Sequence, residues 1–392
     1  MGGYEPYALL STADSARPLG RDGMNARPYF FTAAMLMLTM VFTACNKDEY
    51  VAGWEKKGEG KSIATVWKNG IAKRLSDGTY AAEAKSVFIS GKDVFVVGKE
   101  ANSEGKDVAT LWKNGKPHRL SNGEKDAVAQ SIYVSGNVVY VVGYEGRSDE
   151  SVACLWKNGV LQSLSDYKDG TKANSVFVYG QDVYVAGVAT DYGDILKMNY
   201  SIAALWKNGI YQRIPGGDLH SEAHSVFVSN NNVYVTFTEY DVRKYNQSDP
   251  IYTAATLWND GNTQRLSDSD NEAEANSVFV IGSDVYVAGK EGRRLSLLET
   301  KNMLEKDIGF DLRQAEKISV ATMWKNGESQ RLGDMSKKSR ATSVYVSGKD
   351  VYVSGEEEVK ENVRVAMLWK NGVAHRLTDG EHPSAANSVF VK

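Results

Sequence analysis

Short apolar runs alternate with polar turns along most of the chain, and the alternation repeats about every 45 residues. Each repeat holds four such runs: an Ala-x-x-Trp run, a short run that ends in Arg-Leu in most copies, a Ser-Val-Phe-Val run and a Val-Tyr-Val-Ala-Gly run, or close variants of these. β-branched and aromatic residues fill the runs, as a pleated and half-buried surface prefers. The pattern predicts four short β-strands in each repeat.

A tryptophan followed by a tight turn marks every repeat. The tryptophans are Trp67, Trp112, Trp156, Trp206, Trp258, Trp324 and Trp369. Lys-Asn-Gly follows all of them except Trp258, which precedes Asn-Asp-Gly. Both turn sequences are strong hairpin signals, because a type I′ turn needs positive φ at its two central residues. We therefore expect an antiparallel hairpin after each tryptophan.

Four antiparallel strands in a repeat of this length are typical of propeller blades. We predict an all-β fold: a seven-bladed β-propeller of four-stranded antiparallel blades. The last repeat ends with its third strand at 388–392, and residues 48–53 match the missing fourth strand. Pairing of these N- and C-terminal strands would close the ring. We expect the Ser-Val-Phe-Val strand to lie innermost; a register with the Ala-x-x-Trp strand innermost is the alternative.

The N-terminal segment predicts export. The apolar run from Tyr29 to Ala44 is short for a membrane-spanning helix, which needs about 20 residues, and suits a signal peptide. Val-Phe-Thr-Ala before Cys45 is similar to a lipobox. We predict an over-long gene start at 1–23, a lipoprotein signal peptide at 24–44, a lipidated tether at 45–47 and the propeller at 48–392. An uncleaved anchor and an ordinary secretory signal are the alternatives.

The Trp-Lys-Asn-Gly repeat, together with Cys45 and the Asn-Lys-Asp-Glu that follows it, resembles the Trp-Lys-Asn-Gly repeat β-propeller lipoproteins of Bacteroidota. The resemblance covers residues 48–392. It implies a propeller at the cell surface, attached to the outer membrane through a lipid on Cys45 only, and it brings no activity.

Charge and cysteine content narrow the range of partners. The chain has 46 basic and 49 acidic residues, for a net charge of −3, which does not favour a nucleic-acid partner. A lipidated Cys45 leaves Cys154 without a disulfide partner. Cys154 occupies a position that Thr or Ala fills in other repeats, so we expect it in the core and not as a nucleophile.

Chemical motifs are few. His220 and His224 frame Glu222, but no third ligand for a closed zinc site is evident in the sequence. Nucleophile, phosphate-loop and paired-carboxylate motifs do not stand out either. We predict no catalytic residue, no metal site and no cofactor.

The two faces of the disc differ, because successive turns of an antiparallel blade alternate between them. One face carries the uniform Lys-Asn-Gly turns, whose six lysines would either solubilise the turns or form a basic ring. The other face carries insertions at 188–200, 238–252 and 290–317, and variable loops often mark the binding side of a repeat protein. The last insertion is expected to form a short apolar helix. Tyrosines in the insertions are candidates for ligand contact: Tyr192, Tyr240 and Tyr245.

A second set of candidates lies at the start of the third strand, where every repeat reads Ala-x-Ser. The residue x is always polar but changes between repeats: Lys85, Gln130, Asn174, His224, Asn276, Thr342 and Asn387. If this strand is innermost, these side chains ring the channel mouth on the variable face. Amides and hydroxyls there suit a neutral polyol better than a strongly charged ligand. The alternative is a solvated channel lining.

The leading hypothesis is a surface-exposed propeller that binds a glycan or protein ligand through its variable face. One alternative is an extracellular polysaccharide hydrolase or lyase, which would place two carboxylates, or a histidine and a carboxylate, around the channel mouth. Another is an assembly scaffold in an outer-membrane complex, which would use the apolar insertion at 290–317.

Overall fold

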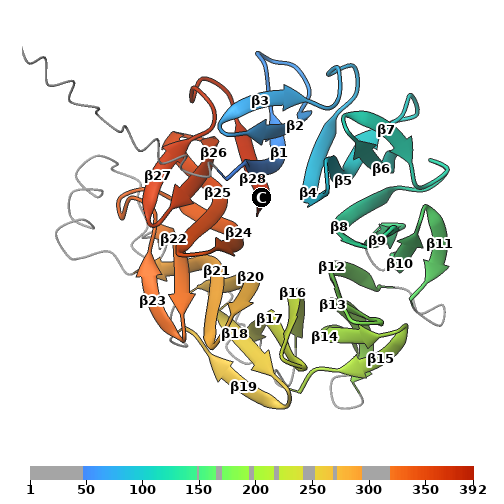
Figure 1. Cartoon of the computed structure of the whole chain (residues 1–392), viewed down its shortest axis with the longest axis vertical. Coiled ribbons are helices and arrows are strands. Elements are labelled where there is room, and N and C mark those ends of the chain that lie inside the picture. Colours follow the sequence, from blue (N-terminus) through green and yellow to red (C-terminus); the bar gives the residue numbers. More distant parts are fainter. Residues whose placement is uncertain are drawn as a thin grey trace, which may run out of the picture. The chain divides into compact units, whose positions relative to one another are not determined.

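The computed structural model is all-β, with seven four-stranded antiparallel blades arranged in a ring (Figure 1), as the repeat predicts. It describes residues 47–147, 150–164, 170–193, 198–215, 220–241, 252–267, 272–293 and 318–392. The predictions for 1–46, including the signal peptide and Cys45, and for the insertion at 294–317 lie outside these ranges. Within them, no helix is long and apolar enough to cross a membrane.

Six blades are continuous in sequence. Blade 1 comprises β4 (Ala82–Ser90), β5 (Asp93–Ala101), β6 (Asp107–Lys113) and β7 (Lys116–Arg119). Blade 2 comprises β8 (Ala127–Ser135), β9 (Val138–Glu145), β10 (Val152–Lys157) and β11 (Val160–Ser163). Blade 3 comprises β12 (Lys172–Tyr179), β13 (Asp182–Gly193), β14 (Met198–Lys207) and β15 (Ile210–Arg213). Blade 4 comprises β16 (His220–Ser229), β17 (Asn232–Asp241), β18 (Tyr252–Asn259) and β19 (Asn262–Arg265). Blade 5 comprises β20 (Ala273–Ile281), β21 (Asp284–Arg293), β22 (Ile318–Lys325) and β23 (Glu328–Arg331). Blade 6 comprises β24 (Ser339–Ser347), β25 (Asp350–Lys360), β26 (Val363–Lys370) and β27 (Val373–Arg376).

The seventh blade joins the two ends of the propeller, as the sequence predicts. Its strands are β28 (Ser384–Val391), β1 (Glu49–Glu55), β2 (Ile63–Lys68) and β3 (Ile71–Arg74), in that order across the sheet. The backbone N–H of Asp48 donates to the carbonyl of Lys392, and the N–H of Lys392 donates to the carbonyl of Asp48, both at 2.9 Å. Because β28 pairs with β1, no sheet edge is left open where the ring closes.

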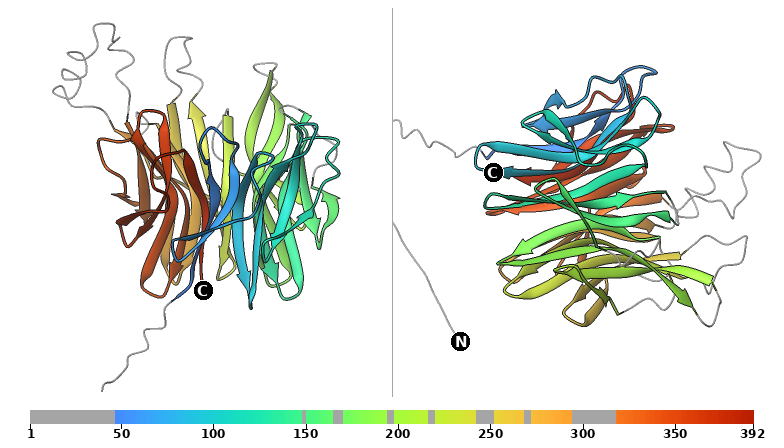
Figure 2. Two further views of the ribbon diagram at one scale, coloured as in Figure 1. Left: turned by 90° about the horizontal axis from the view of Figure 1, so that it is seen from above. Right: turned by 90° about the vertical axis from the view of Figure 1, so that its right-hand side faces the viewer.

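The Ser-Val-Phe-Val strand is the innermost strand of every blade (Figure 1), which settles the register in favour of the expected one. Seen from the side, the strands run between the two faces of the disc (Figure 2). We name these faces by their connections. The turn face carries the Lys-Asn-Gly turns and the innermost hairpins, such as 91–92; the loop face carries the connections after the outermost and second strands, such as 75–81 and 102–106.

The repeat tryptophans pack between neighbouring blades. Six of them are at most 2% exposed, whereas Trp258 is partly exposed. Blade 4 also departs from the repeat beside this Trp. Phe237 stands where the second strand of every other blade has a glycine. At one such glycine, Gly98, an added Cβ would lie 1.9 Å from the carbonyl oxygen of Glu83, so the backbones pack too closely for a side chain.

Cys154 is buried in the core cluster between blades 1 and 2, in accord with the prediction. Burial raises the pKa of its thiol to about 12. The thiolate, which is the nucleophilic form, is therefore scarce at neutral pH.

The Lys-Asn-Gly turns have positive φ at Asn and Gly, for example 54° at Asn114 and 85° at Gly115, as the type I′ prediction requires. Each Asn side chain also ties the turn to the start of the second strand. In blade 1 it donates to Asp93 at 2.8 Å and accepts from the Val94 N–H at 2.9 Å. Lys113 lies 2.9 Å from Asp93 and 5.1 Å from the ring centroid of Phe95. Most of the turn lysines form such ion pairs with carboxylates. The turn face therefore does not present a ring of unpaired positive charges.

Candidate functional site

The variable residue x is a β-bulge in all seven blades. In blade 1, Ala84 pairs with Gly98 and Ser86 pairs with Val97, which leaves Lys85 between them without a partner on β5. The same shift recurs in every innermost strand. A bulge re-aims a side chain and locally ends the pairing. Sequence analysis missed this feature, although one variable residue between two unvarying ones was its signal.

The serine after x accepts a hydrogen bond from a neighbouring blade. This link explains why a serine occurs at this position in every repeat. The Val176 N–H of blade 3 donates to Ser131 Oγ of blade 2 at 3.2 Å. Equivalent bonds join five further pairs of adjacent blades at 3.2–3.4 Å. The innermost strands have no further strand on their channel side, so these hydroxyls satisfy backbone groups that the sheet leaves free.

Several x side chains make a second link between blades. Asn174, Asn276 and Asn387 donate through Nδ2 to an alanine carbonyl in the next blade, at 2.7–2.9 Å. Thr342 Oγ1 donates to such a carbonyl at 2.7 Å. These groups therefore hold the ring together, and only their remaining hydrogen-bonding capacity is available to a ligand.

Three x residues differ from this pattern. Lys85 pairs with Glu83 at 2.6 Å, and His224 Nε2 lies 3.0 Å from the Thr238 hydroxyl. Gln130 makes no hydrogen bond with the part of the chain that the structure describes. Its amide is the x group with the most unused donors and acceptors.

Seven aromatic side chains narrow the channel toward the turn face. They come from the innermost strands and form a closed circle, with neighbouring ring centroids 4.5–5.0 Å apart: Phe88, Tyr133, Phe177, Phe227, Phe279, Tyr345 and Phe390. The circle lies three residues beyond x along each strand. It therefore narrows the channel on the turn-face side of the x residues.

A cavity of about 860 Å³ opens on the loop face. Five x residues line it: Gln130, Asn174, His224, Asn276 and Thr342. Lys85 and Asn387 are not among its described lining residues. The side chains of Tyr192 and Tyr245 lie outside the described residues, and Tyr240 is hydrogen-bonded to Glu222 without being among the lining residues. The structure thus brings five of the ten predicted contact residues to one cavity.

Charged side chains also line the cavity, which the sequence analysis did not anticipate. Lys172, Glu222 and Arg340 lie two residues before x, where strand alternation places them on the same side. Glu274 holds the equivalent position in blade 5. A search for polar residues at this spacing would have found them. The expected neutral lining is therefore incomplete, because the mouth combines amides with charges of both signs.

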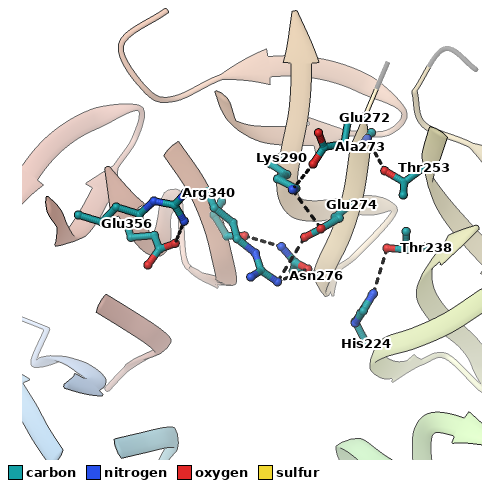
Figure 3. Close-up of polar contacts among 12 residues, drawn as sticks. His224, Thr238, Thr253, Glu272, Ala273, Glu274, Asn276, Lys290, Arg340 and Glu356 are labelled. Atoms are coloured by element: carbon teal, nitrogen blue, oxygen red, sulfur yellow. Dashed lines mark hydrogen bonds and ion pairs between the residues drawn. The ribbon is translucent and has the colours of Figure 1, made fainter. Parts of the chain in front are cut away.

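Two neighbouring carboxyl groups have pKa values displaced in opposite directions. Burial raises the pKa of Glu222, and the nearby Glu274 carboxylate raises it further against the effect of Lys172. Glu274 is also buried, but Arg340 at 3.3 Å and Lys290 at 3.1 Å outweigh that effect and hold its pKa below the ordinary value. Arg340 reaches both Glu274 and the Asn276 amide oxygen (Figure 3).

Both histidines of the cavity wall make contacts with neighbouring residues. Burial lowers the pKa of His224 to about 4, despite the attraction of the Glu274 carboxylate. His220 Nδ1 accepts the Ser201 N–H at 3.2 Å, and its ring meets Tyr200 edge-on with centroids 6.2 Å apart. Among the described residues, no group of three or more His, Cys, Asp or Glu side chains is arranged to hold a metal ion.

Comparison with known proteins identifies the fold and no family. No protein-family model and no curated protein matches the chain. A puromycin hydrolase structure matches with a TM-score of 0.51 at 10% identity, over 86% of this chain and 52% of that one. A puromycin-hydrolysing peptidase of Mycobacterium tuberculosis gives 0.49 at 10% identity, over 78% and 48%. A thermostable family-43 glycoside hydrolase gives 0.37 at 11%, over 64% and 93%. The chain spans about half the length of the two puromycin-hydrolysing enzymes, and its distant structural neighbours are peptidases and a glycoside hydrolase.

Proposed function

We propose that this protein is a surface lipoprotein whose propeller binds a glycan in the cavity on its loop face. The observation that carries the proposal is the cavity of about 860 Å³, a size typical of ligand sites, with hydrogen-bonding side chains from adjacent blades in its wall. Amides bind sugar hydroxyls as donor and acceptor at once. Tyr144 and Tyr200, also in the wall, supply flat amphipathic surfaces.

Binding can be tested by blocking the cavity. Gln130→Trp places a large side chain in the wall at a residue that makes no hydrogen bond with described residues, so the ring links stay intact. We expect titration calorimetry with a panel of oligosaccharides to find a ligand for the wild-type protein and at least tenfold weaker binding by this variant. Asn137→Trp is the matched control, because Asn137 lies exposed in the hairpin turn that follows the same strand, on the turn face. Equal weakening by both variants would contradict the proposal.

The proposed location has a separate test. Metabolic labelling with a palmitate analogue should mark the protein, and Cys45→Ala should abolish the label. A mutant that is still labelled would show that the lipobox interpretation is wrong, without affecting the binding proposal.

A hydrolase is the second candidate, favoured by two carboxyl groups at equivalent positions of adjacent blades, Glu222 in the cavity wall and Glu274 in the next blade, whose pKa values are displaced in opposite directions. Such a pair can divide the roles of general acid and general base. If the protein cleaves a bound glycan, Glu222→Gln should abolish product formation and retain binding. Binding without cleavage across the whole panel would leave the binding protein as the function.

A further inference from the structure

The cations near the channel mouth are paired with carboxylates, with one exception among the described residues. Lys85 and Lys99 contact Glu83 and Asp107, at distances down to 2.6 Å. On the opposite side, Lys290 and Arg340 contact Glu272 and Glu274. Lys172 forms no ion pair with any described residue. Its ammonium instead lies 5.3 Å from the ring centroid of Tyr144, within the cavity wall.

Two unused donors line the same cavity as Lys172. Gln130 comes from the innermost strand of blade 2, Tyr144 from the end of the next strand of that blade, and Lys172 from the innermost strand of blade 3. All three line the cavity. Neither the Gln130 amide nor the Tyr144 hydroxyl makes a hydrogen bond with described residues. The sector therefore combines an ammonium, an amide N–H₂ and a phenol O–H, which are all donors to an anion.

Lys172 is partly buried and has no carboxylate partner among the described residues, so an anionic ligand would supply its counter-ion. An ammonium in a recess loses part of its hydration, and the cation–π contact replaces it only in part. Glu222, a carboxyl group of the same wall that interacts electrostatically with Lys172, makes its own hydrogen bond with Tyr240. Because the pKa of Glu222 is raised, its carboxyl group is a weaker counter-ion for Lys172.

We propose that the bound glycan carries a carboxylate, as a uronic acid does, and that Lys172, Gln130 and Tyr144 bind this group. The proposal rests on the proposed function and specifies its ligand. The carboxylate would accept a charge-assisted hydrogen bond from Lys172 Nζ and further hydrogen bonds from Gln130 and Tyr144. The neighbouring amides would contact the sugar hydroxyls.

The test compares short oligo-uronides with their carboxyl-reduced counterparts, which differ only in having CH₂OH in place of each carboxylate. The protein is residues 46–392, which hold all 28 strands and every core cluster. We expect the uronide to bind roughly 10- to 100-fold more tightly than the reduced sugar, as the loss of a hydrogen bond to a charged group implies. Raising the ionic strength should reduce this preference.

Variants test whether Lys172 causes the preference for the uronide over the reduced sugar. Lys172→Met should abolish the preference for the uronide and leave the affinity for the reduced sugar unchanged, whereas Lys172→Arg should retain it. Lys85→Met removes the same charge from the same mouth, at a residue outside the cavity wall, and should behave as wild type. Melting temperatures of all variants control for folding.

The outcomes separate the two proposals. If uronide and reduced sugar bind equally, or if Lys172→Met keeps the preference, the carboxylate site is wrong while glycan binding stands. If no glycan binds, the proposed function fails. If an acidic peptide binds in a Lys172-dependent manner and no uronide does, the ligand is a protein and the sugar assignment is overturned.

Discussion

At the scale of single residues, the bulge position x shows how one backbone geometry serves different side chains. Asparagine at x uses its amide to bridge to the next blade, as at Asn174, Asn276 and Asn387. His224 occupies the same geometry in blade 4 and bonds to Thr238 within its own blade. An imidazole can change its charge near neutral pH, whereas an amide cannot. His224 should therefore make this bulge sensitive to acid.

The first prediction concerns the stability of the propeller as a function of pH. Folding lowers the pKa of His224 from 6.5 to about 4, so between these values the unfolded chain binds more protons than the folded one. Stability contributed by the neutral imidazole is complete above about pH 6.5 and is lost as the pH falls toward 4. His224→Asn, which installs the residue that three other blades have at x, should remove this dependence. Urea unfolding at pH 7.5 and 5 should show that the wild-type protein loses about 1–2 kcal/mol more than the variant. Equal losses would mean that His224 can be protonated in the folded state.

At the scale of the element, the third strand of each blade has, near its end, a Trp that packs in the core between blades. Trp156 is fully buried between blades 1 and 2, whereas Trp258 is partly exposed beside Phe237. The same residue type thus occurs in two environments within one repeat architecture. This difference allows the burial of the Trp to be tested inside a single protein.

The second prediction is that Trp156→Ala destabilises the propeller by about 3–5 kcal/mol, the usual range for a large buried aromatic residue. Trp258→Ala should cost less, because less of its surface leaves water on folding. Chemical denaturation of the two variants measures both values. A cost for Trp156→Ala near zero would contradict the blade assignment. Neither replacement should selectively weaken ligand binding in protein that remains folded, since these side chains do not line the cavity.

The sequence was informative about elements because each strand and turn is specified by neighbouring residues. Trp-Lys-Asn-Gly, or Trp-Asn-Asp-Gly in one repeat, determines a hairpin locally, and the seven hairpins reinforce one another. The bulge at Lys85 was not predicted, because it depends on which residues of β4 and β5 face each other. The bond from Asn174 to the Ala223 carbonyl was beyond prediction for the same reason: it joins residues 49 positions apart in sequence.

At the scale of the whole molecule, the cavity exists because the ring is closed. The residues that line it come from blades 2 to 6, so no blade could form the site alone. The seven-fold count and the joined termini follow from the sequence. The sequence does not predict which groups the charged residues of the wall face, because the neighbours of Lys172 and Arg340 across the channel depend on the curvature of the ring. Any ligand site of this kind requires that the seventh blade hold its two ends together.

The last prediction tests this closure. Removal of residues 388–392 deletes the part of β28 that pairs with Glu49–Ala52, leaving β1 with an open edge and uncovering the core cluster that includes Val389 and Val391. We expect residues 46–387 to melt well below 46–392 and to aggregate, because an unpaired edge invites other chains.

A circular permutant provides the control for this deletion. In blade 1 a Gly-Lys pair at 91–92 connects the innermost strand to the next one, and Lys392 and Asp48 occupy the positions on either side of such a turn. Joining them through Gly-Lys and opening the chain between Glu124 and Lys125, both exposed, should restore a continuous hairpin. The permutant should melt at least as high as 46–392, because the linkage lowers the entropy of the unfolded chain without straining the fold. Equal melting of 46–387 and 46–392 would show that the final five residues do not stabilise the ring. A permutant that fails to fold would show that the termini are not held in hairpin geometry.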